Sequence, residues 1–347
     1  MPLKLDICTR YNIDGGSSRL RYYLYQNYLE QSGWSVRYFP FYGKKYLSKL
    51  YANKSVKFDR CTALVKRLAE SCFLNKNLLI EYELLPAIPA GIENLFLKNR
   101  NYILNFDDYV WAKYENISYL QDKYDRLIAH AKGVIVANDV LYQKVSKLNS
   151  NIIKIPTVVE LASYRKENTA LEKFPKFTIV WIGTPVTYHT YLENLAPMFR
   201  QLTLICDYQL LVIAKESLPL MEGVPQKNIN WSEEVETSIL SKCHVGIMPL
   251  IDDQFARGKS AYKLIQYQAA NLPSVASPVG ENKNVIIHGE NGFLATTNED
   301  WIKYLTLLNS DSELLLKMGK KASNCAYEYS LEKYGPIFNQ FLLDSLQ

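Results

Sequence analysis

Short apolar runs alternate with helix-length amphipathic segments along the whole chain. The run Thr178–Ile182 has no polar–apolar alternation, which is typical of a strand that is buried on both faces of a parallel sheet. Leu3–Cys8 and Tyr102–Phe106 read as strands of the same kind in the first half. This repeated order of strand and helix predicts α/β structure built on doubly wound parallel sheets.

The length of the chain, 347 residues, suffices for two domains of ordinary size. A hydrophobic content of 48% with 22% charged residues is a globular composition, so a packed core is expected. The polar segment Ser163–Lys176 separates two series of strands and helices, and we expect it to be the linker. Two Rossmann-like domains are therefore predicted, over residues 1–165 and 166–347. The final helix belongs either to the second domain or crosses back to the first.

A cationic turn follows a strand-like run that ends at Pro249. If Lys259 lies in the first turn of the next helix, Lys263 and Gln266 share its face. The cations and the free N–H groups of the helix start then converge, and that arrangement suits a phosphate or diphosphate. The alternative is a solvated basic helix start that binds nothing.

Polar residues also follow other predicted strands. Gly15 and Gly16 open a turn before a helix, and Gly183–Thr184 does so after Thr178–Ile182. Asp107 and Asp108 follow Tyr102–Phe106, and carboxylates at that end of a parallel strand point into the ligand crevice. One of them is expected to orient an acceptor hydroxyl or to take its proton, whereas Asp108 can instead be a helix N-cap.

The net charge of +5 is unevenly distributed. Between Tyr42 and Lys76, lysines and arginines outnumber the two acids, Asp59 and Glu70, and tyrosines and leucines lie between them. Such a stretch suits peripheral contact with anionic lipid headgroups or with a lipid diphosphate. Two amphipathic surface helices with snorkelling lysines are the alternative. No recognition motif for nucleic acid accompanies the charge, so no nucleic-acid partner is expected.

The cysteines and histidines are scattered and show no metal-ligand spacing, so no metal site is predicted. The cysteine pattern fits small core residues in a reducing compartment. No apolar run is long enough to span a bilayer, and the chain goes from Met1 directly into a strand, so no signal peptide is expected. These features predict a cytoplasmic protein, with the inner face of the membrane as a further possibility.

The segment after the cationic turn resembles the nucleotide-sugar signature of glycosyltransferase family 4. The matching residues are Lys263, Gln266, Tyr267, Ala269, Ala270, Leu272–Pro273, Val275–Ser277, Pro278–Gly280 and His288–Leu294. The resemblance implies the GT-B architecture, with two Rossmann-like domains that face an interdomain cleft. It also implies metal-independent, retaining transfer of a hexose from a nucleotide-diphosphate donor to an acceptor hydroxyl, without a further cofactor. UDP- or GDP-sugars are the expected donors.

The resemblance assigns the acceptor to the N-terminal domain and the donor to the C-terminal domain. Together with the residue patterns above, this predicts catalytic roles for Asp107, Asp108, Arg257 and Lys263. The predicted donor contacts are Gly15, Gly16, Gly183, Thr184, Arg257, Gly258, Lys259, Ser260, Lys263 and Gln266. Two glutamates that hold the donor in this family are replaced here by Gly258 and Gln266.

The resemblance implies a glycan or a lipid-linked acceptor in the synthesis of cell-surface polysaccharide or lipid-linked glycan. Two other functions stay open on the same fold. One is a nucleotide-sugar epimerase, which needs no acceptor. The other is a catalytically inactive binding or scaffold protein, which the replaced glutamates favour.

Overall fold

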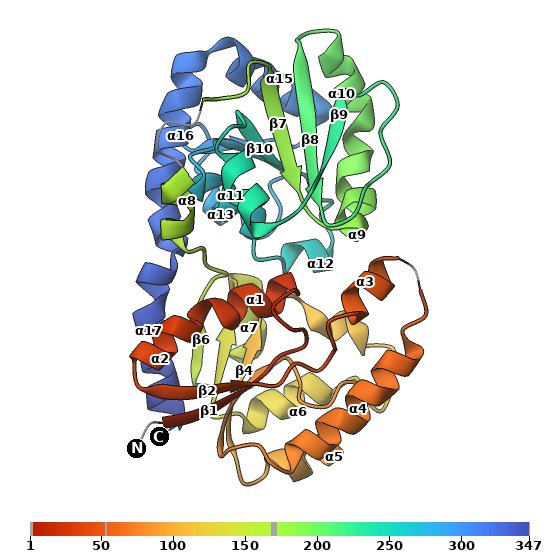
Figure 1. The fold of residues 1–347 in the computed structure, drawn as a ribbon, viewed down its shortest axis with the longest axis vertical. Coiled ribbons are helices and arrows are strands. Elements are labelled where there is room, and N and C mark those ends of the chain that lie inside the picture. The colour runs from red at the N-terminus through yellow and green to blue at the C-terminus, as the bar shows by residue number, and fades with distance from the viewer. Residues whose placement is uncertain (1–2, 53, 168–171, 347) are drawn as a thin grey trace. The chain divides into compact units, whose positions relative to one another are not determined.

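A computed structural model describes residues 3–52, 54–167 and 172–346 (Figure 1). The chain divides into two compact units. The first contains the chain up to Val158, Gly258–Ser260 and the chain from Lys333 onward. The second contains Val159–Arg257 and Ala261–Glu332. The division therefore precedes the predicted boundary at 165/166.

The predicted linker, Ser163–Lys176, is in part helical. Helix α8 (Leu161–Glu167) begins before it, and Leu161 and Tyr164 pack into an apolar cluster of the second unit. These apolar side chains explain why the unit begins earlier than the polar composition suggested. Residues 168–171 of the predicted linker lie outside the described residues.

The first unit contains a six-stranded sheet in which every neighbouring pair is parallel. Its strands are β1 (Leu3–Cys8), β2 (Trp34–Tyr38), β3 (Asn77–Glu81), β4 (Asn101–Phe106), β5 (Gly133–Val136) and β6 (Ile152–Lys154). Their order across the sheet is β2-β1-β3-β4-β5-β6. The second strand pairs with one edge of β1, and β3 and the later strands follow on the other edge. The strand order therefore reverses between β1 and β3.

Helices connect the strands of the first unit, and a long helix lies at the C-terminus of the chain (Figure 1). They are α1 (Gly16–Arg21), η1 (Tyr23–Tyr25), α2 (Gln26–Gln31), α3 (Tyr46–Tyr51), α4 (Lys57–Ser71), α5 (Ala90–Leu97), η2 (Val110–Lys113), α6 (Lys123–His130), α7 (Asp139–Val145) and α17 (Leu331–Leu346). In α17, the Phe338 ring stacks on Tyr25 at 4.3 Å. The Trp34 indole N–H also donates to Asn339 Oδ1 at 2.7 Å. From Lys333 on, the final helix therefore packs within the first unit.

The second unit has its own sheet of six parallel strands. They are β7 (Phe177–Ile182), β8 (Tyr208–Ala214), β9 (Gln226–Asn230), β10 (Val245–Met248), β11 (Ser274–Ala276) and β12 (Gly292–Leu294). The order is β12-β11-β10-β7-β8-β9, which reverses between β7 and β10. All six residues of β7 are buried, as its unbroken apolar sequence predicts.

Most of the helices of the second unit are short. Besides α8 they are α9 (Pro185–Thr187), η3 (Tyr188–Leu192), η4 (Glu193–Leu195), α10 (Ala196–Thr203), α11 (Glu233–Leu240), α12 (Gln254–Arg257), α13 (Tyr262–Ala269), α14 (Asn282–Val285), α15 (Asn298–Ser310), α16 (Ser312–Ala326) and η5 (Tyr327–Tyr329). The single helix expected after Gly183–Thr184 is instead a series of helical turns from Pro185 to Thr203.

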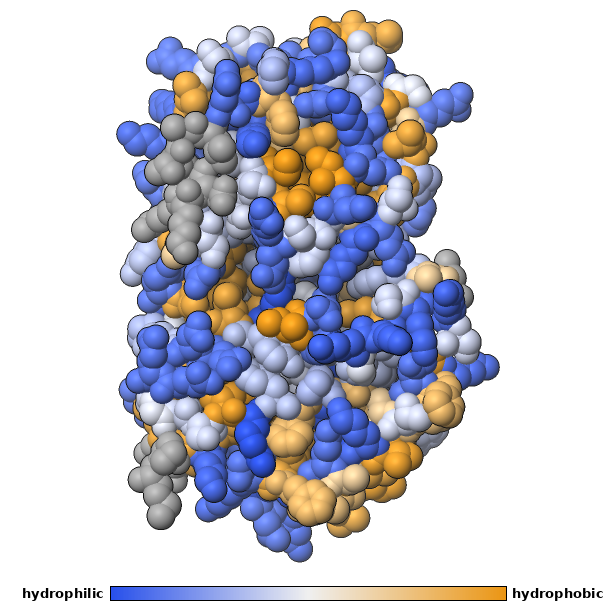
Figure 2. All heavy atoms as spheres, viewed as in Figure 1, coloured by the Kyte–Doolittle hydropathy of each residue, from blue (hydrophilic) through white to orange (hydrophobic). Residues whose placement is uncertain are grey.

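Within the part of the chain that the structure describes, no helix is long and apolar enough to cross a bilayer. Polar and apolar side chains are mixed on the face seen in Figure 2, and a group of apolar side chains lies over α4 and α5.

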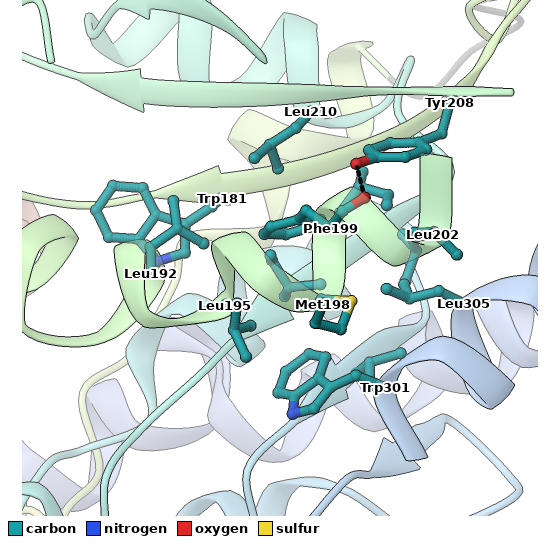
Figure 3. Packing of buried hydrophobic residues seen from close by; sticks show 14 of the residues in the cluster. Trp181, Leu192, Leu195, Met198, Phe199, Leu202, Tyr208, Leu210, Trp301 and Leu305 are labelled. Atoms are coloured by element: carbon teal, nitrogen blue, oxygen red, sulfur yellow. Dashed lines mark hydrogen bonds between the residues drawn. The ribbon is translucent and has the colours of Figure 1, made fainter. Parts of the chain in front are cut away.

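Large aromatic and aliphatic side chains fill the core of the second unit between its sheet and helices α10 and α15 (Figure 3). Trp181 of β7 and Phe199 of α10 are fully buried there, and Trp301 of α15 is 2% exposed. The Tyr208 hydroxyl donates to the Phe199 backbone carbonyl at 2.8 Å, so the one polar atom of the tyrosine side chain has a hydrogen-bond partner. The core thus fixes the position of β7, whose carboxyl end carries predicted site residues.

Candidate functional site

In each unit, predicted site residues lie at the carboxyl ends of the strands where the strand order reverses. In open α/β sheets, the connections on either side of such a point run to opposite faces and leave a crevice, which is where ligands bind. In the first unit this point lies between β1 and β3, and in the second between β7 and β10.

In the first unit, hydroxyl groups connect two buried carboxyl groups. We call Ser17, Glu81, Tyr82 and Asp107 the acidic cluster. The Ser17 hydroxyl lies 2.7 Å from Asp107 Oδ2 and 3.1 Å from Glu81 Oε1. The Tyr82 hydroxyl donates to the other oxygen of Asp107. The sequence places these groups together because β3 and β4 are adjacent and in register, with Glu81 opposite Asn105.

The α1 turn completes the surroundings of Glu81. The Ser18 hydroxyl donates to Glu81 Oε2 at 2.6 Å, and the Arg10 backbone N–H donates to the same oxygen at 2.7 Å. Gly15 precedes α1, and a Cβ atom there would lie 2.4 Å from Tyr11 Cβ. Gly15 therefore has a packing role in the turn that presents both serines, whereas Gly16 has open space around its Cα.

Burial and the charge of Asp107 raise the pKa values of two carboxyl groups, Glu81 in the acidic cluster and Asp108 next to it in the sequence. Burial, followed by the charge of Asp107, raises the pKa of Glu81 to about 7. The same two causes raise the pKa of Asp108 to about 7. The Asp108 carboxyl is thus a group that exchanges a proton near neutrality. The 3-10 helix that follows has Tyr109 as its N-cap, so the alternative N-cap role of Asp108 is wrong.

An internal ion network holds the segment that carries Tyr82. Tyr82 and Ala87 both have positive φ angles, 62° and 63°, which are costly for non-glycine residues. The fully buried Lys123 ammonium contacts Glu83 Oε2 at 2.6 Å, Glu93 Oε2 at 2.9 Å and the Leu85 carbonyl at 2.6 Å. Although burial acts in the opposite direction, the charges of Lys123 and Lys113 lower the pKa of Glu83 to about 2.

The raised pKa of Glu81 predicts a pH-dependent stability. The folded-state pKa of about 7 lies above the ordinary value of 4.5, so the native state holds the proton more tightly between those values. The contribution of Glu81 to stability is therefore present below the lower value and is lost as pH rises through 7. Glutamine does not titrate, so the variant Glu81→Gln lacks this pH dependence. From acid to neutral pH, we therefore expect the free energy of unfolding of the unmodified protein to fall by about 3 kcal/mol relative to that of the variant. Urea unfolding at both pH values measures this shift, and an unchanged difference would contradict it.

In the second unit, Gly183 and Thr184 follow β7. A Cβ atom at Gly183 would lie 2.4 Å from the Trp181 ring, so this turn has space only for glycine. The Gly183 N–H donates to the Ile213 carbonyl at 3.0 Å, and the Thr184 N–H donates to Thr187 Oγ1 at 3.1 Å. These two N–H groups thus have hydrogen-bond partners within the unit. The sequence pattern had predicted that they would donate to a ligand.

Lys263 is the second residue of α13, and its ammonium group lies 4.3 Å from the centre of the Trp181 ring. A cation above an indole face is attracted by the negative face of the ring system. The Trp181 indole N–H is itself buried without a hydrogen-bond partner. Trp181 therefore holds the Lys263 side chain against the carboxyl end of β7, at the point where the strand order reverses.

Arg257 ends the short helix α12 and forms an ion pair with Asp252. Arg257 Nε lies 2.6 Å from Asp252 Oδ1, and Arg257 Nη2 lies 3.1 Å from Oδ2. Both side chains are more than half exposed, so a bound anion can compete for the guanidinium at low cost. Asp253 has a structural role, because its Oδ1 accepts from the Ala256 N–H at 2.7 Å and caps α12.

The helix after the cationic turn begins later than predicted. Ala261 has a left-handed backbone with a φ of 53°, and α13 starts only at Tyr262. Lys259 is therefore not in the first helical turn, and the shared face of Lys259, Lys263 and Gln266 is wrong. Gly258, Lys259 and Ser260 belong to the first unit by their contacts. Gln266 is 3% exposed and hydrogen-bonds with Tyr164 in the core.

The backbone at Gly280 packs closely against the backbone of Arg257. Gly280 has a φ of 53°, and a Cβ atom there would lie 2.6 Å from the Arg257 carbonyl oxygen. Both the positive φ and the close approach require glycine. The Pro278–Gly280 part of the signature therefore supports the segment that carries Arg257.

Sequence reasoning missed Glu81, Ser17, Tyr82 and Trp181 as site residues. The argument that selected Asp107, a carboxylate after a buried strand, applies equally to Glu81 at the end of β3. For Trp181, no signal in the sequence distinguishes an indole beneath a lysine from any core tryptophan. In residues 3–52, 54–167 and 172–346, no group of three His, Cys, Asp or Glu side chains is placed to hold a metal ion.

Comparisons with known proteins bear on both units. Residues 176–311 match the family described as "Glycosyl transferases group 1". A stretch of 115 residues, 33% of the chain, is 27% identical to the GDP-Man:Man(3)GlcNAc(2)-PP-Dol alpha-1,2-mannosyltransferase of Dictyostelium discoideum. The match spans 21% of the length of that relative.

Solved structures are similar along the whole chain. A glycosyltransferase from Rickettsia africae has a TM-score of 0.70 and 14% identity, and the match covers 100% of this chain and 99% of that one. Sucrose-phosphate synthase from Thermosynechococcus elongatus has a TM-score of 0.69 and 13% identity, with coverages of 99% and 98%. HepE from Anabaena, solved in complex with UDP, has a TM-score of 0.66 and 11% identity, with coverages of 99% and 100%. At these identities the likeness shows the fold, and it confirms the predicted two-domain, Rossmann-like GT-B class.

Proposed function

We propose that this protein, a GT-B chain whose residues 176–311 belong to the group 1 glycosyltransferases, is a retaining glycosyltransferase. It moves a hexose from a nucleotide-diphosphate donor to an acceptor hydroxyl. The second unit binds the donor, and UDP- or GDP-sugars are the donors that we expect. The first unit binds the acceptor.

The proposed reaction breaks the bond between the anomeric carbon and the diphosphate oxygen of the donor. A new bond forms between that carbon and the acceptor oxygen on the same face of the sugar. The diphosphate leaves with the bonding electrons, and the acceptor hydroxyl loses a proton. The groups of this chain therefore have two tasks: to stabilise negative charge on the diphosphate, and to receive or relay a proton.

The position of Lys263 is the observation that carries the proposal. Its ammonium group is held 4.3 Å above Trp181, at the carboxyl end of β7 and inside the matched segment. A fixed cation costs little reorganisation when charge develops on the leaving group, so it favours the transition state over the bound donor. Arg257, in the same connection between β10 and β11 as Lys263, adds a second positive charge once it exchanges Asp252 for the ligand.

The acidic cluster supports the acceptor assignment. Asp107 accepts from two hydroxyls, and Asp108 is a carboxyl group with a pKa near neutrality. We assign Asp107 to the orientation of the acceptor hydroxyl and Asp108 to proton exchange. We further propose that the acceptor is a glycan or a lipid-linked glycan, and that the protein works at the inner face of a membrane with peripheral contact through the Tyr42–Lys76 region.

Ligand binding tests the donor assignment directly. A ligand that binds the native state raises its stability in proportion to the logarithm of its concentration above Kd. In a thermal-shift screen, we expect a UDP- or GDP-sugar to raise the Tm by a few degrees at concentrations well above Kd, and Lys263→Met to reduce that rise. Donor consumption without an acceptor would identify the protein as an epimerase. No shift with any nucleotide sugar would favour the inactive binding protein.

Metal removal is expected to leave the reaction unchanged. The negative charge of the diphosphate is assigned to Lys263 and Arg257, so a chelator should not lower the rate. Release of nucleoside diphosphate, measured with EDTA and with added Mg²⁺, checks this expectation. A loss of turnover in EDTA that Mg²⁺ restores would show that these cations do not suffice.

A further inference from the structure

The basic region from Tyr42 to Lys76 contains an exposed apolar stripe that neither the core nor the proposed active site uses. Its most exposed large side chains are Phe58 and Phe73, both 78% exposed, and Val65, 68% exposed. Two of the tyrosines that the sequence suggested for this role are buried instead. Tyr42 and Tyr46 are 6% and 4% exposed, and their rings stack at 3.7 Å.

One line of mostly apolar residues runs along the solvent-facing side of helix α4. Successive residues rotate by about 100° around an α-helix, so residues three or four apart lie on one line. On α4 that line, with Cys72 as its C-cap, contains Phe58, Thr62, Val65, Ala69 and Cys72, all of them exposed. We call it the α4 stripe. The opposite face of α4 has the buried residues Ala63, Arg67 and Ser71, which attach the helix to the first unit.

This arrangement reverses the usual pattern of a surface helix, which has charged residues opposite its buried face. Large exposed apolar side chains on one contiguous surface are characteristic of a site that contacts a partner or a membrane. Leu95 of α5, 74% exposed, and Lys76 line a surface hollow of about 340 Å³, and Leu74, which follows Phe73 in the sequence, also lines it. In Figure 2 the apolar side chains of this surface lie over α4 and α5.

The charge around the α4 stripe is positive. Lys57 and Lys66 lie on its two sides by helical position, and both are exposed. The acids of α4 are paired with cations, since Asp59 lies 2.8 Å from the Lys49 ammonium and Glu70 lies 3.2 Å from the Lys66 ammonium. The region therefore presents apolar side chains flanked by lysines, without unpaired acidic groups among the residues of α4 that the structure describes.

We propose that the α4 stripe inserts into the headgroup layer of an anionic lipid bilayer, with the flanking lysines on lipid phosphates. Apolar side chains gain free energy when they enter the acyl boundary, and each lysine near an anionic surface adds to the attraction. An amphipathic helix of this kind lies in the plane of the interface and does not span the membrane. The inference rests on the proposed membrane contact, and it moves that contact from the tyrosines to Phe58 and Val65 of the α4 stripe and to Phe73 beyond its end.

Vesicle co-sedimentation of the full chain tests the α4 stripe. We expect binding to vesicles that contain phosphatidylglycerol, and at least about tenfold weaker binding to pure phosphatidylcholine. The double variant Phe58→Ser/Val65→Ser should bind the anionic vesicles at least about tenfold more weakly. Both residues are exposed, so their replacement leaves the core intact. Leu204→Ser/Leu220→Ser is the matched control, because it removes two exposed leucines of the second unit, 87% and 67% exposed.

Each other outcome contradicts the inference. Equal binding by the Phe58→Ser/Val65→Ser variant would show that lysines alone make the contact. No binding by the unmodified protein would exclude this membrane surface. Light scattering that shows a dimer, lost in the variant without a change in vesicle binding, would identify the stripe as an interface between two copies. The donor-induced thermal shift, measured on the same proteins, separates these results from a failure of the proposed transferase function.

Discussion

Replacing Lys263 with methionine lowers turnover by about 100- to 1000-fold, which is the effect of removing one fixed donor to a developing negative charge. Methionine keeps much of the side-chain volume and the contact with Trp181, so the change removes mainly the charge. We expect a smaller effect on donor affinity than on kcat, because the charge matters most when the diphosphate leaves. The measurement is the release of nucleoside diphosphate from the donor that the thermal screen identifies.

The matched control is Lys303→Met. The Lys303 ammonium also lies near an aromatic ring, 5.3 Å from the centre of Tyr304, but on helix α15. This variant should retain the full rate. That result would show that removing a lysine from a cation–π contact does not by itself lower turnover. If Lys263→Met folds normally and turns over like the unmodified protein, Lys263 has no role in stabilising the leaving group.

Replacing Asp107 with asparagine is expected to lower turnover by about 100-fold or more, in the range found for groups that handle a proton or orient its donor. The amide removes the negative charge that accepts from Ser17 and Tyr82, and its NH₂ group cannot accept in place of an oxygen. The acceptor-dependent part of nucleotide release should fall, whereas the donor-induced thermal shift should persist. This combination separates an acceptor role from a donor role.

Asp139→Asn serves as the control for Asp107. Asp139 lies in the first turn of α7, where it pairs with Lys154 at the surface at 2.6 Å. Its replacement should cost little stability, since exposed ion pairs contribute little, and should not change turnover. Equal loss of donor binding and of acceptor-dependent release in Asp107→Asn would mean that the residue supports the fold of the unit and has no acceptor role.

The acidic cluster shows how far a strand-end argument reaches. The sequence selected Asp107 because it follows a buried strand, and the structure places it beside Glu81 at the end of the neighbouring strand. Both carboxylates lie at the carboxyl end of a buried strand, so both could be predicted from the sequence as site residues. The contact with Tyr82 was not, because it depends on a left-handed backbone at Tyr82 and on the Glu83–Lys123 network that holds it.

The α4 stripe shows the opposite case. Composition predicted a basic region suited to lipid contact, but it did not distinguish Tyr42 and Tyr46, which are buried, from Phe58 and Val65, which are exposed. Periodicity alone marks two faces of α4 without saying which one packs on the unit. That choice follows from the partners of the helix, which lie far away in sequence.

The sequence by itself determined the two parallel α/β sheets and the strand ends where polar residues gather, because both follow from local apolar pattern and turn residues. Only the tertiary structure decided which of those polar groups meet. Ala261 adopts a left-handed backbone that removes Lys259 from the helix, and Trp181 lies beneath Lys263 because β7 and α13 pack in one core. Such pairings are set by long-range packing, which no local sequence pattern encodes.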